Sequence, residues 1–394
     1  VKLYLKDIQN IAKDYKFFCF GETAIDILDS KIPDFYFLIS YIEIHDIYKN
    51  FDNVYRIKIY PFSYFFTYKT KNIFLVQLDK KELEDFNILI NRLKSYSNLN
   101  FIIPILYDIN KGIFKNLKNC FLHYNKNSSK RELTYDEKKL YKKSRYIEYK
   151  EKDYVEMHLK KEEFLVVWLD QILKIVNTKN NYKEIKISIL YLIMISHESS
   201  IIIEQIARTD FFIEFFPLLS ECKNHYQAKE YHPEGTLYDH LIKTAIELES
   251  TDFALKLAAI LHDIGKIKTY NYKANNSNPK YPNHATISSR IAIEYLKKIA
   301  DYFPFYPDLV NKVSFLIENH MKIAFLPELD EKRQQEIINS RFLNELLKLL
   351  KADLKASLAD LNIYKRVYSY VQKKNNKKLT KNEREFNSKN YKFF

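Results

Sequence analysis

The chain has 394 residues, 46% of them hydrophobic, which is enough for two or three domains with packed cores and excludes a disordered protein. The longest apolar run, Ile187–Ile195, is shorter than the roughly 18 to 20 residues that a membrane span needs. The formal net charge of +13 suits a polyanionic partner such as RNA, although lysine excess also accompanies an AT-rich genome. The three cysteines are far apart, so no disulfide framework or zinc ribbon is expected. The start of the chain lacks the apolar segment of a signal peptide. We therefore expect a cytoplasmic protein without a membrane segment.

Residues 1–125 are predicted to form a small α/β head. Helical spacing in Leu3–Tyr15 is followed by runs rich in β-branched and aromatic residues, which are typical of strands. These strand candidates are Phe17–Gly21, Phe35–Ile39, Tyr55–Tyr60 and Ile73–Leu78. A turn at Asp108–Gly112 and a polar hinge at Asn125–Lys130 close this part of the chain.

The pattern from Thr134 onward is helical almost throughout. We expect a helical middle region over residues 134–222, an all-helical domain over 223–370 and a basic, flexible tail over 371–394. The predicted fold class is therefore α+β, with a mixed-sheet head and a mostly helical body. Neither a G-x-G-x-x-G motif nor a Walker A loop is present, which argues against Rossmann and P-loop folds.

Histidine and aspartate residues form a spaced pattern in the helical domain. Thr236 is predicted to cap a helix with His240 in its first turns. A second helix is expected from Asp252 to Gly265, with an adjacent histidine and aspartate on its last turn, followed by a lysine. These three residues are His262, Asp263 and Lys266, and later predicted helices add His284, His320 and Asp353.

Imidazole and carboxylate groups together can hold a divalent ion that retains open positions for water and phosphate. Lys266 would face the phosphate and offset its charge. Any one of these histidines alone would more often be an ordinary core or surface residue. The combination of His240, the His262-Asp263 pair, Gly265 and Lys266 is more specific, and residues 231–353 resemble the HD superfamily of metal-dependent phosphohydrolases.

The HD resemblance implies a ligand set and a cofactor. The family's metal-ligand positions fall on His240, His262, Asp263 and Asp353. His284 and His320 match positions that some members use for ligation or for phosphate contact. The implied cofactor is a divalent metal, and mixed His/Asp ligation allows Mn, Ni, Mg, Fe, Co or Zn.

The segments Tyr231–Thr236 and Asn283–Ser289 resemble the HD region of bacterial tRNA nucleotidyltransferases, the CCA-adding and poly(A) polymerase family. That family opens with a Gly-Gly turn, an Arg-Asp helix and an Asp-x-Asp pair. Gly21, Asp26 and Asp34 match this layout, but Glu22, Ile25 and Tyr36 replace the second glycine, the arginine and the second aspartate. A single aspartate cannot hold the two Mg²⁺ ions of nucleotidyl transfer. Gln77 stands where a third carboxylate is expected, and Asp79 lies two residues on.

Three further segments follow the family's order. Glu84–Asn91 and Leu106–Leu117 resemble its head motifs, and the helix over Asp136–Arg145 keeps the spacing of its basic residues. These basic residues, which the resemblance makes candidates for RNA or nucleotide contact, are Lys139, Lys142 and Arg145. No arginine follows Glu162–Glu163, where the base-selecting motif would fall.

Three functions remain open from the sequence. The first is an HD phosphohydrolase acting on a phosphomonoester or cyclic phosphodiester of a nucleotide or RNA end. In this case the head has little or no nucleotide-adding activity. The second is a tRNA nucleotidyltransferase with rearranged ligands. The third is a non-catalytic RNA-binding protein. RNA, including tRNA, or a nucleotide is the expected partner in each case.

Overall fold

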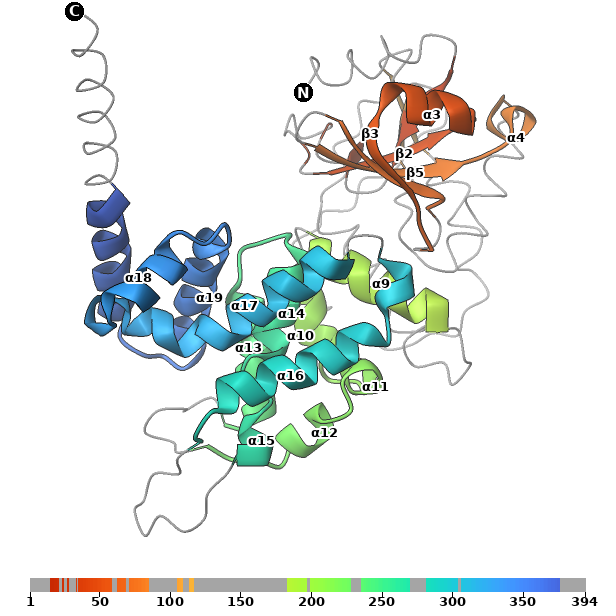
Figure 1. Ribbon diagram of the computed structural model, residues 1–394. Helices are drawn as coiled ribbons and strands as arrows, with labels where there is room; N and C mark the ends of the chain where they lie inside the picture. The colour runs from red at the N-terminus through yellow and green to blue at the C-terminus, as the bar shows by residue number, and fades with distance from the viewer. Residues whose placement is uncertain are drawn as a thin grey trace, which may run out of the picture. The chain divides into compact units, whose positions relative to one another are not determined.

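The computed structural model describes residues 15–20, 23–24, 27, 33, 35–58, 62–68, 71–84, 105–108, 113–116, 183–196, 199–227, 235–269, 281–303 and 306–375 (Figure 1). The chain divides into two compact units. The first comprises Val1–Glu198 with Asp301–Pro304, and the second comprises Ser199–Ala300 with Phe305–Phe394. Each unit has its own architecture.

The first unit contains a seven-stranded mixed sheet in the order β3-β4-β5-β2-β1-β6-β7. Among the described strands, only β2 and β5 pair in parallel, and the other neighbours are antiparallel. The strands are β1 (Phe17–Cys19), β2 (Phe35–Ser40), β3 (Asp52–Arg56), β4 (Tyr64–Tyr68), β5 (Lys71–Gln77), β6 (Ile105–Asp108) and β7 (Ile113–Asn116). The mixed sheet predicted for the head is confirmed, but β4, β6 and β7 were not foreseen, and the strand expected over Tyr55–Tyr60 begins at Asp52 and ends at Arg56.

Both faces of the central strands are buried. On one face, Tyr36 and Leu38 of β2 join an apolar cluster with Phe66 and Leu75, and Ile47 of α3 (Ile44–Asn50) belongs to the same cluster. On the other face, ring contacts link aromatic residues of the sheet, and Phe62 just before β4, to α9 (Lys183–Ile195). These residues are Phe37, Phe62, Phe74 and Tyr191. A short helix, α4 (Lys80–Glu84), follows β5.

The second unit is helical over its described residues, apart from one isolated bridge between Tyr226 and Thr236. Its α-helices are α10 (Ser199–Ile206), α11 (Phe211–Phe215), α12 (Leu219–Cys222), α13 (Leu237–Glu247), α14 (Phe253–Leu261), α15 (Lys266–Thr269), α16 (His284–Lys297), α17 (Tyr306–Ala324), α18 (Glu331–Ile338) and α19 (Leu343–Ala356). A short 3₁₀ helix covers Leu326–Glu328, residues 362–375 are also helical, and a second 3₁₀ helix, Ala300–Tyr302, lies at the boundary between the two units in the sequence. The helical body predicted from the sequence is therefore confirmed for these residues.

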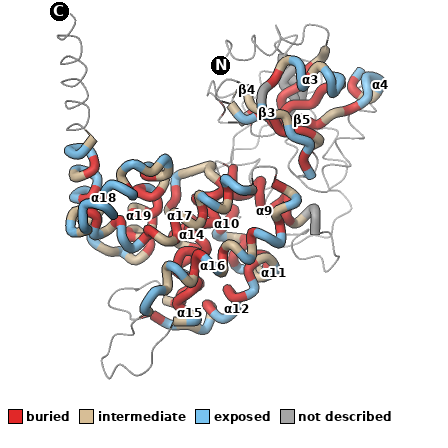
Figure 2. Tube along the Cα trace, viewed as in Figure 1, coloured by how far each residue is buried: buried red, intermediate tan, exposed pale blue. Residues whose placement is uncertain are grey.

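Helix α14 is the centre of this bundle, and every one of its residues is buried (Figures 1 and 2). Helices α13, α17 and α19 pack around it. Because α13, α17, α19 and the turn after α14 carry the predicted metal ligands, the core of the bundle fixes their relative positions. No described helix is both long enough and apolar enough to cross a bilayer.

The end of α14 differs from the prediction. The helix ends at Leu261 rather than at Gly265, and residues 262–265 form a turn before α15. Gly265 does not act as a left-handed cap, since Gly235 is the glycine with positive φ in the described chain. A Cβ on Gly265 would lie 2.5 Å from the carbonyl oxygen of His284 and 2.6 Å from the amide nitrogen of Ser288. The glycine is required because this turn packs directly on the backbone of α16.

Candidate metal centre

His240 is held at the start of α13 by a capping box. The Thr236 hydroxyl accepts a hydrogen bond from the Asp239 amide, while the Asp239 carboxylate accepts one from the Thr236 amide at 2.9 Å. These bonds satisfy amide groups that the helix itself leaves unpaired. His240 follows one residue later and is completely buried. The predicted cap therefore positions the first candidate ligand.

Three further histidines share one orientation. The Nδ1 atom of each lies within hydrogen-bonding distance of the carbonyl oxygen three residues earlier: His262 to Ala259 at 2.9 Å, His284 to Tyr281 at 2.8 Å and His320 to Ile317 at 2.7 Å. A carbonyl oxygen can only accept, so Nδ1 must carry the proton. In the neutral imidazole, Nε2 then presents a lone pair, which is the arrangement found in metal-binding histidines.

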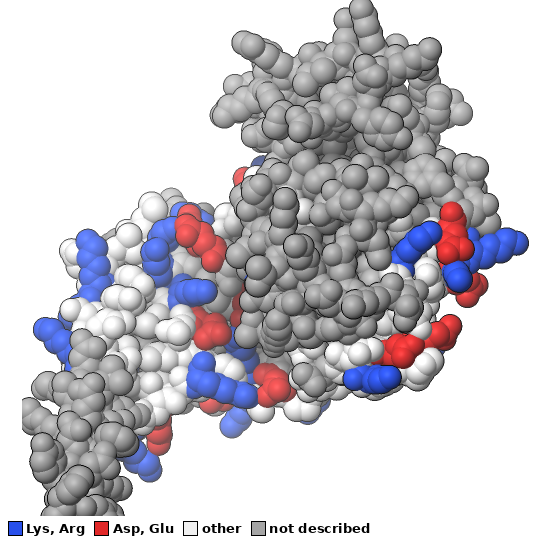
Figure 3. Space-filling view, turned by 90° about the horizontal axis from the view of Figure 1, so that it is seen from above, with Lys and Arg blue, Asp and Glu red and all other residues white. Residues whose placement is uncertain are grey.

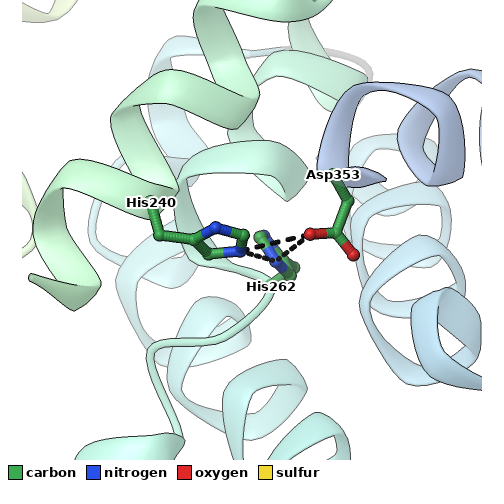
Figure 4. Close-up of side chains that lie close together, drawn as sticks. All are labelled: His240, His262 and Asp353. Atoms are coloured by element: carbon green, nitrogen blue, oxygen red, sulfur yellow. Dashed lines mark hydrogen bonds and ion pairs between the residues drawn. The ribbon is translucent and has the colours of Figure 1, made fainter. Parts of the chain in front are cut away.

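The first group of candidate ligands is His240, His262 and Asp353, which come from α13, the turn after α14, and α19 (Figure 4). Asp353 Oδ1 lies 3.2 Å from His240 Nε2 and 3.9 Å from His262 Nε2, and the two Nε2 atoms are 3.3 Å apart. Two ligand atoms that are each about 2.1 Å from one ion lie about 3 to 3.5 Å apart. Two of the three separations lie in this range and the third is slightly longer, so these residues could hold a shared metal ion.

The second group surrounds Asp263. Its Oδ1 atom lies 3.1 Å from His284 Nε2 and 3.2 Å from His320 Nε2, and its Oδ2 atom lies 3.5 Å from His262 Nε2. His262, Asp263 and His320 also form a geometrically possible metal-binding set. His262 belongs to both groups, so the two candidate positions adjoin one another.

Buried polar atoms in the second group are left without hydrogen-bond partners. Within the described part of the chain these include Asp263 Oδ1, His284 Nε2 and His320 Nε2. With Nδ1 protonated, both imidazoles turn a lone pair toward a carboxylate oxygen, so acceptors face an acceptor. An unsatisfied buried polar atom is costly, and a cation among these three would relieve the mismatch. The residues present therefore fit a divalent metal ion.

The charges of the cluster favour metal binding at neutral pH. Burial lowers the pKa of His262 to about 4, so its imidazole is neutral and has no proton at Nε2 to displace. Burial alone would raise the pKa of Asp263, but the Lys266 ammonium and the neighbouring imidazoles together outweigh burial and hold that pKa well below its usual range. For Asp353, burial would also raise the pKa, but the interactions with His240 and His262 together outweigh burial and lower it. Both carboxylates are therefore ionised.

His284 behaves differently from His262. Burial would lower its pKa, but its contact with the Asp263 carboxylate outweighs burial and raises the pKa above the ordinary value. A fraction of the His284 side chains therefore carries a second proton at neutral pH, and binding of a metal ion to His284 would release it.

Lys266 is buried and lies against this cluster. Its Nζ atom is 2.6 Å from Asp263 Oδ2 and donates to Gln227 Oε1 at 2.9 Å, and it lies 5.3 Å from the centre of the Tyr281 ring. The Tyr281 hydroxyl in turn lies 2.9 Å from His225 Nε2. No sequence motif singles out His225, Gln227 or Tyr281, because only the tertiary fold brings these residues to Lys266.

The structure brings together all seven residues predicted for the metal site and its catalytic surroundings. These are His240, His262, Asp263, Lys266, His284, His320 and Asp353. The candidates in the head, Gly21, Asp26 and Asp34, and the basic candidates, Lys139, Lys142 and Arg145, lie outside the described residues. Tyr36 is described and lies 1% exposed in the apolar cluster under α3, while the Gln77 amide donates to the carbonyl oxygen of Ile42 at 2.8 Å.

Comparison with known families matches residues 231–351 to the HD domain. No curated protein matches the chain. Among solved structures, the chain is similar to a complex of a CCA-adding enzyme with ATP, with a TM-score of 0.30 and 9% identity, over 94% of this chain and 82% of that one. That TM-score is too low for the likeness to bear on function.

Proposed function

We propose that the protein is a metal-dependent phosphohydrolase whose active site is the HD domain. The observation that carries this proposal is the buried cluster in which three imidazoles, each oriented by a backbone carbonyl, meet Asp263 and Asp353. Residues 231–351 match the HD domain, and HD domains are metal-dependent. The proposed ligands are His240, His262, Asp263 and Asp353, with His284 and His320 at the adjoining position.

The protein's own groups each have a defined part in this proposal. The backbone carbonyls fix the imidazole tautomers, and burial of His240, His262 and Asp263 keeps bulk water from competing with substrate. A divalent ion held there would act as a Lewis acid toward phosphate and make a hydroxide nucleophile available near neutral pH. Lys266, beside Asp263, supplies positive charge for the phosphate oxygens. Mn, Ni, Mg, Fe, Co and Zn are all compatible with this donor set.

The substrate class that we propose is the phosphate of a nucleotide or an RNA end, as a monoester or a cyclic phosphodiester. Support comes from the resemblance of the sequence to tRNA nucleotidyltransferases and from the net charge of +13. The charge is weaker support, because acidic and basic side chains of the described residues alternate on the face shown in Figure 3. A cytoplasmic location and the divisions at 1–125, 134–222, 223–370 and 371–394 belong to the same proposal.

Metal analysis of the purified full chain and a phosphatase screen test this function. The screen uses nucleoside monophosphates and 2′,3′-cyclic nucleotides with each candidate metal. We expect His262→Ala and Asp263→Ala to lose bound metal and at least about 100-fold in turnover, because each removes a proposed ligand. His45→Ala is a matched control, since His45 is exposed in the first unit.

Equal turnover by wild type and both ligand variants would reject the phosphohydrolase. If no metal is retained while RNA binds with a steep dependence on salt, the protein is instead a non-catalytic RNA-binding protein.

A further inference from the structure

Gln227 is a buried polar residue beside the metal centre to which the proposed mechanism gives no part. It lies in the segment that forms the isolated bridge with Thr236, and its side chain is 7% exposed. Its partner Lys266 is also 7% exposed. Both side chains are thus withdrawn from bulk water, and Lys266 links Gln227 to Asp263.

The orientation of the Gln227 amide follows from the chemistry of its neighbour. Lysine can only donate, so the oxygen of the amide must face Lys266 Nζ, as it does at 2.9 Å. The Nε2 group is then the other end of the amide. Among the described residues it has no hydrogen-bond partner, although it is buried. Two amide N–H groups are therefore directed at an acceptor that the described chain does not provide.

Lys266 has a spare donor as well. An ammonium group carries three N–H bonds. Asp263 Oδ2 takes one at 2.6 Å and Gln227 Oε1 takes a second at 2.9 Å. The Tyr281 ring, 5.3 Å away, stabilises the charge but accepts no conventional hydrogen bond. One N–H of Lys266 has no oxygen or nitrogen acceptor within the described residues.

Unpaired donors on two adjoining buried side chains are unfavourable unless another group accepts their hydrogen bonds. An oxyanion with several acceptor oxygens meets this need better than a single acceptor does. An oxyanion beside Asp263 is also adjacent to the proposed metal ligands. Lys266 connects the two groups, because its Nζ atom contacts both Gln227 Oε1 and Asp263 Oδ2.

We propose that Gln227 binds substrate: its Nε2 group, with the free N–H of Lys266, donates hydrogen bonds to the phosphate oxygens of the bound ester. This assignment rests on the proposed phosphohydrolase function and names the residue that recognises the phosphate. Gln227 supplies hydrogen bonds without charge, and Lys266 is already partly neutralised by Asp263. The pair therefore favours a phosphate that the metal also holds over a free anion that only the pair would hold.

Binding of inorganic phosphate to the metal-loaded full chain tests this role, measured by calorimetry in wild type, Gln227→Met and Gln227→Glu. Methionine keeps the length and removes the donors, while glutamate replaces the donors with charged acceptors. We expect phosphate affinity to fall about 10-fold in Gln227→Met and about 100-fold in Gln227→Glu. Metal content should stay unchanged, and KM for the phosphate ester should rise with the same ratios.

Gln334 gives the matched control, because it is buried but its Nε2 group is satisfied by the carbonyl oxygens of Pro327 and Leu329. Gln334→Met should lower the melting temperature and leave phosphate affinity unchanged. A direct measurement avoids any folding defect of the variants. In wild-type protein labelled with ¹⁵N-glutamine, the Gln227 side-chain amide resonances should shift on addition of phosphate.

Unchanged phosphate affinity in Gln227→Glu, or unshifted Gln227 amide resonances in wild type, would overturn the assignment and leave water as the partner of this amide. The two proposals can fail separately. Wild-type hydrolysis that Gln227→Glu does not alter rejects the phosphate contact alone. Phosphate binding that depends on Gln227, in a protein that hydrolyses no ester, rejects the phosphohydrolase alone.

Discussion

The hydrogen bonds of three imidazoles determine which nitrogen atoms of the candidate metal centre could bind an ion. His262, His284 and His320 each have Nδ1 beside the carbonyl oxygen three residues earlier. The sequence identifies the three histidines but not which nitrogen is protonated, because that depends on backbone geometry at each helix or turn. The backbone around each histidine therefore leaves a lone pair on Nε2 in the neutral imidazole. The Nε2 atoms of all three lie close to the Asp263 carboxylate.

Lys256 is a buried ionisable residue elsewhere in the same core. It is completely buried, and its ammonium donates to the carbonyl oxygens of Ala245 at 2.8 Å and Leu248 at 2.6 Å. These carbonyl groups lie at the end of α13 and just beyond it. Burial lowers the pKa of Lys256 to about 8. Lys256 therefore couples the stability of the bundle to pH.

The direction of this dependence can be predicted. An unfolded lysine has a pKa near 10.4, so between about pH 8 and 10.4 the unfolded chain binds more protons than the folded chain. The free energy of unfolding should then rise with pH across this window, by about 3 kcal/mol at most, in wild type relative to Lys256→Met. Urea unfolding at about pH 7.5, 9 and 10 measures this difference.

Lys348→Met, at an exposed position on α19, is the control and should show no such trend. If the difference in unfolding free energy between wild type and Lys256→Met stays constant with pH, the buried ammonium does not titrate in this range.

At the level of helices, the start of α13 links stability to metal binding. Thr236→Ala removes the capping hydroxyl and should lower the free energy of unfolding by about 1 kcal/mol. Because His240 lies in the first turn, fraying there should also weaken metal affinity, which competition with a chelating dye measures.

Asp330→Ala is the matched variant. Asp330 caps α18 through the Arg333 amide at 3.0 Å, and α18 carries none of the candidate ligands. Its loss should reduce stability to a similar extent with metal affinity unchanged. Equal metal affinity in Thr236→Ala and wild type would show that His240 is positioned independently of the cap.

The start of α13 was predicted more accurately than the end of α14. Thr236 was identified as a cap because its hydroxyl and the following apolar spacing act locally, and the structure confirms it. The end of α14 was wrong, because the chain leaves the helix after Leu261 to pack a turn on α16. That packing involves residues about twenty positions later, which a local pattern does not contain.

At the scale of the whole molecule, the mixed sheet was predictable but its extent was not. Strand β4 reads Tyr-Phe-Phe-Thr-Tyr, and its neighbours bury both faces, so no alternation of polar and apolar residues marks it. Strands β6 and β7 have four residues each, which is too short for a clear signal. The helical unit and its cluster of candidate ligands were predicted more fully because they rest on spaced motifs.

The buried position of Tyr36 leads to a prediction about the head. A metal site for nucleotidyl transfer needs carboxylates that face water and substrate, whereas Tyr36 packs with Leu38, Phe66 and Leu75. The full chain should therefore add no labelled CTP or ATP to tRNA that lacks its 3′ end, with Mg²⁺ or Mn²⁺. Tyr36→Asp should not create this activity, and it should lower the free energy of unfolding by at least about 3 kcal/mol.

Tyr36→Phe is the control, and it should remain folded because the ring stays in the core. Incorporation of nucleotide by the wild-type chain would contradict this prediction and favour the tRNA nucleotidyltransferase with rearranged ligands.

The close contact at Gly265 limits which substitutions the candidate metal centre tolerates. The space between this turn and α16 is smaller than one methyl group, since an added Cβ would meet two backbone atoms of the helix. On one side of that space stand His262 and Asp263, and on the other stands His284. An added Cβ would force the turn and α16 apart and would separate these candidate ligands. The candidate metal centre therefore requires glycine at position 265 as well as the ligand side chains.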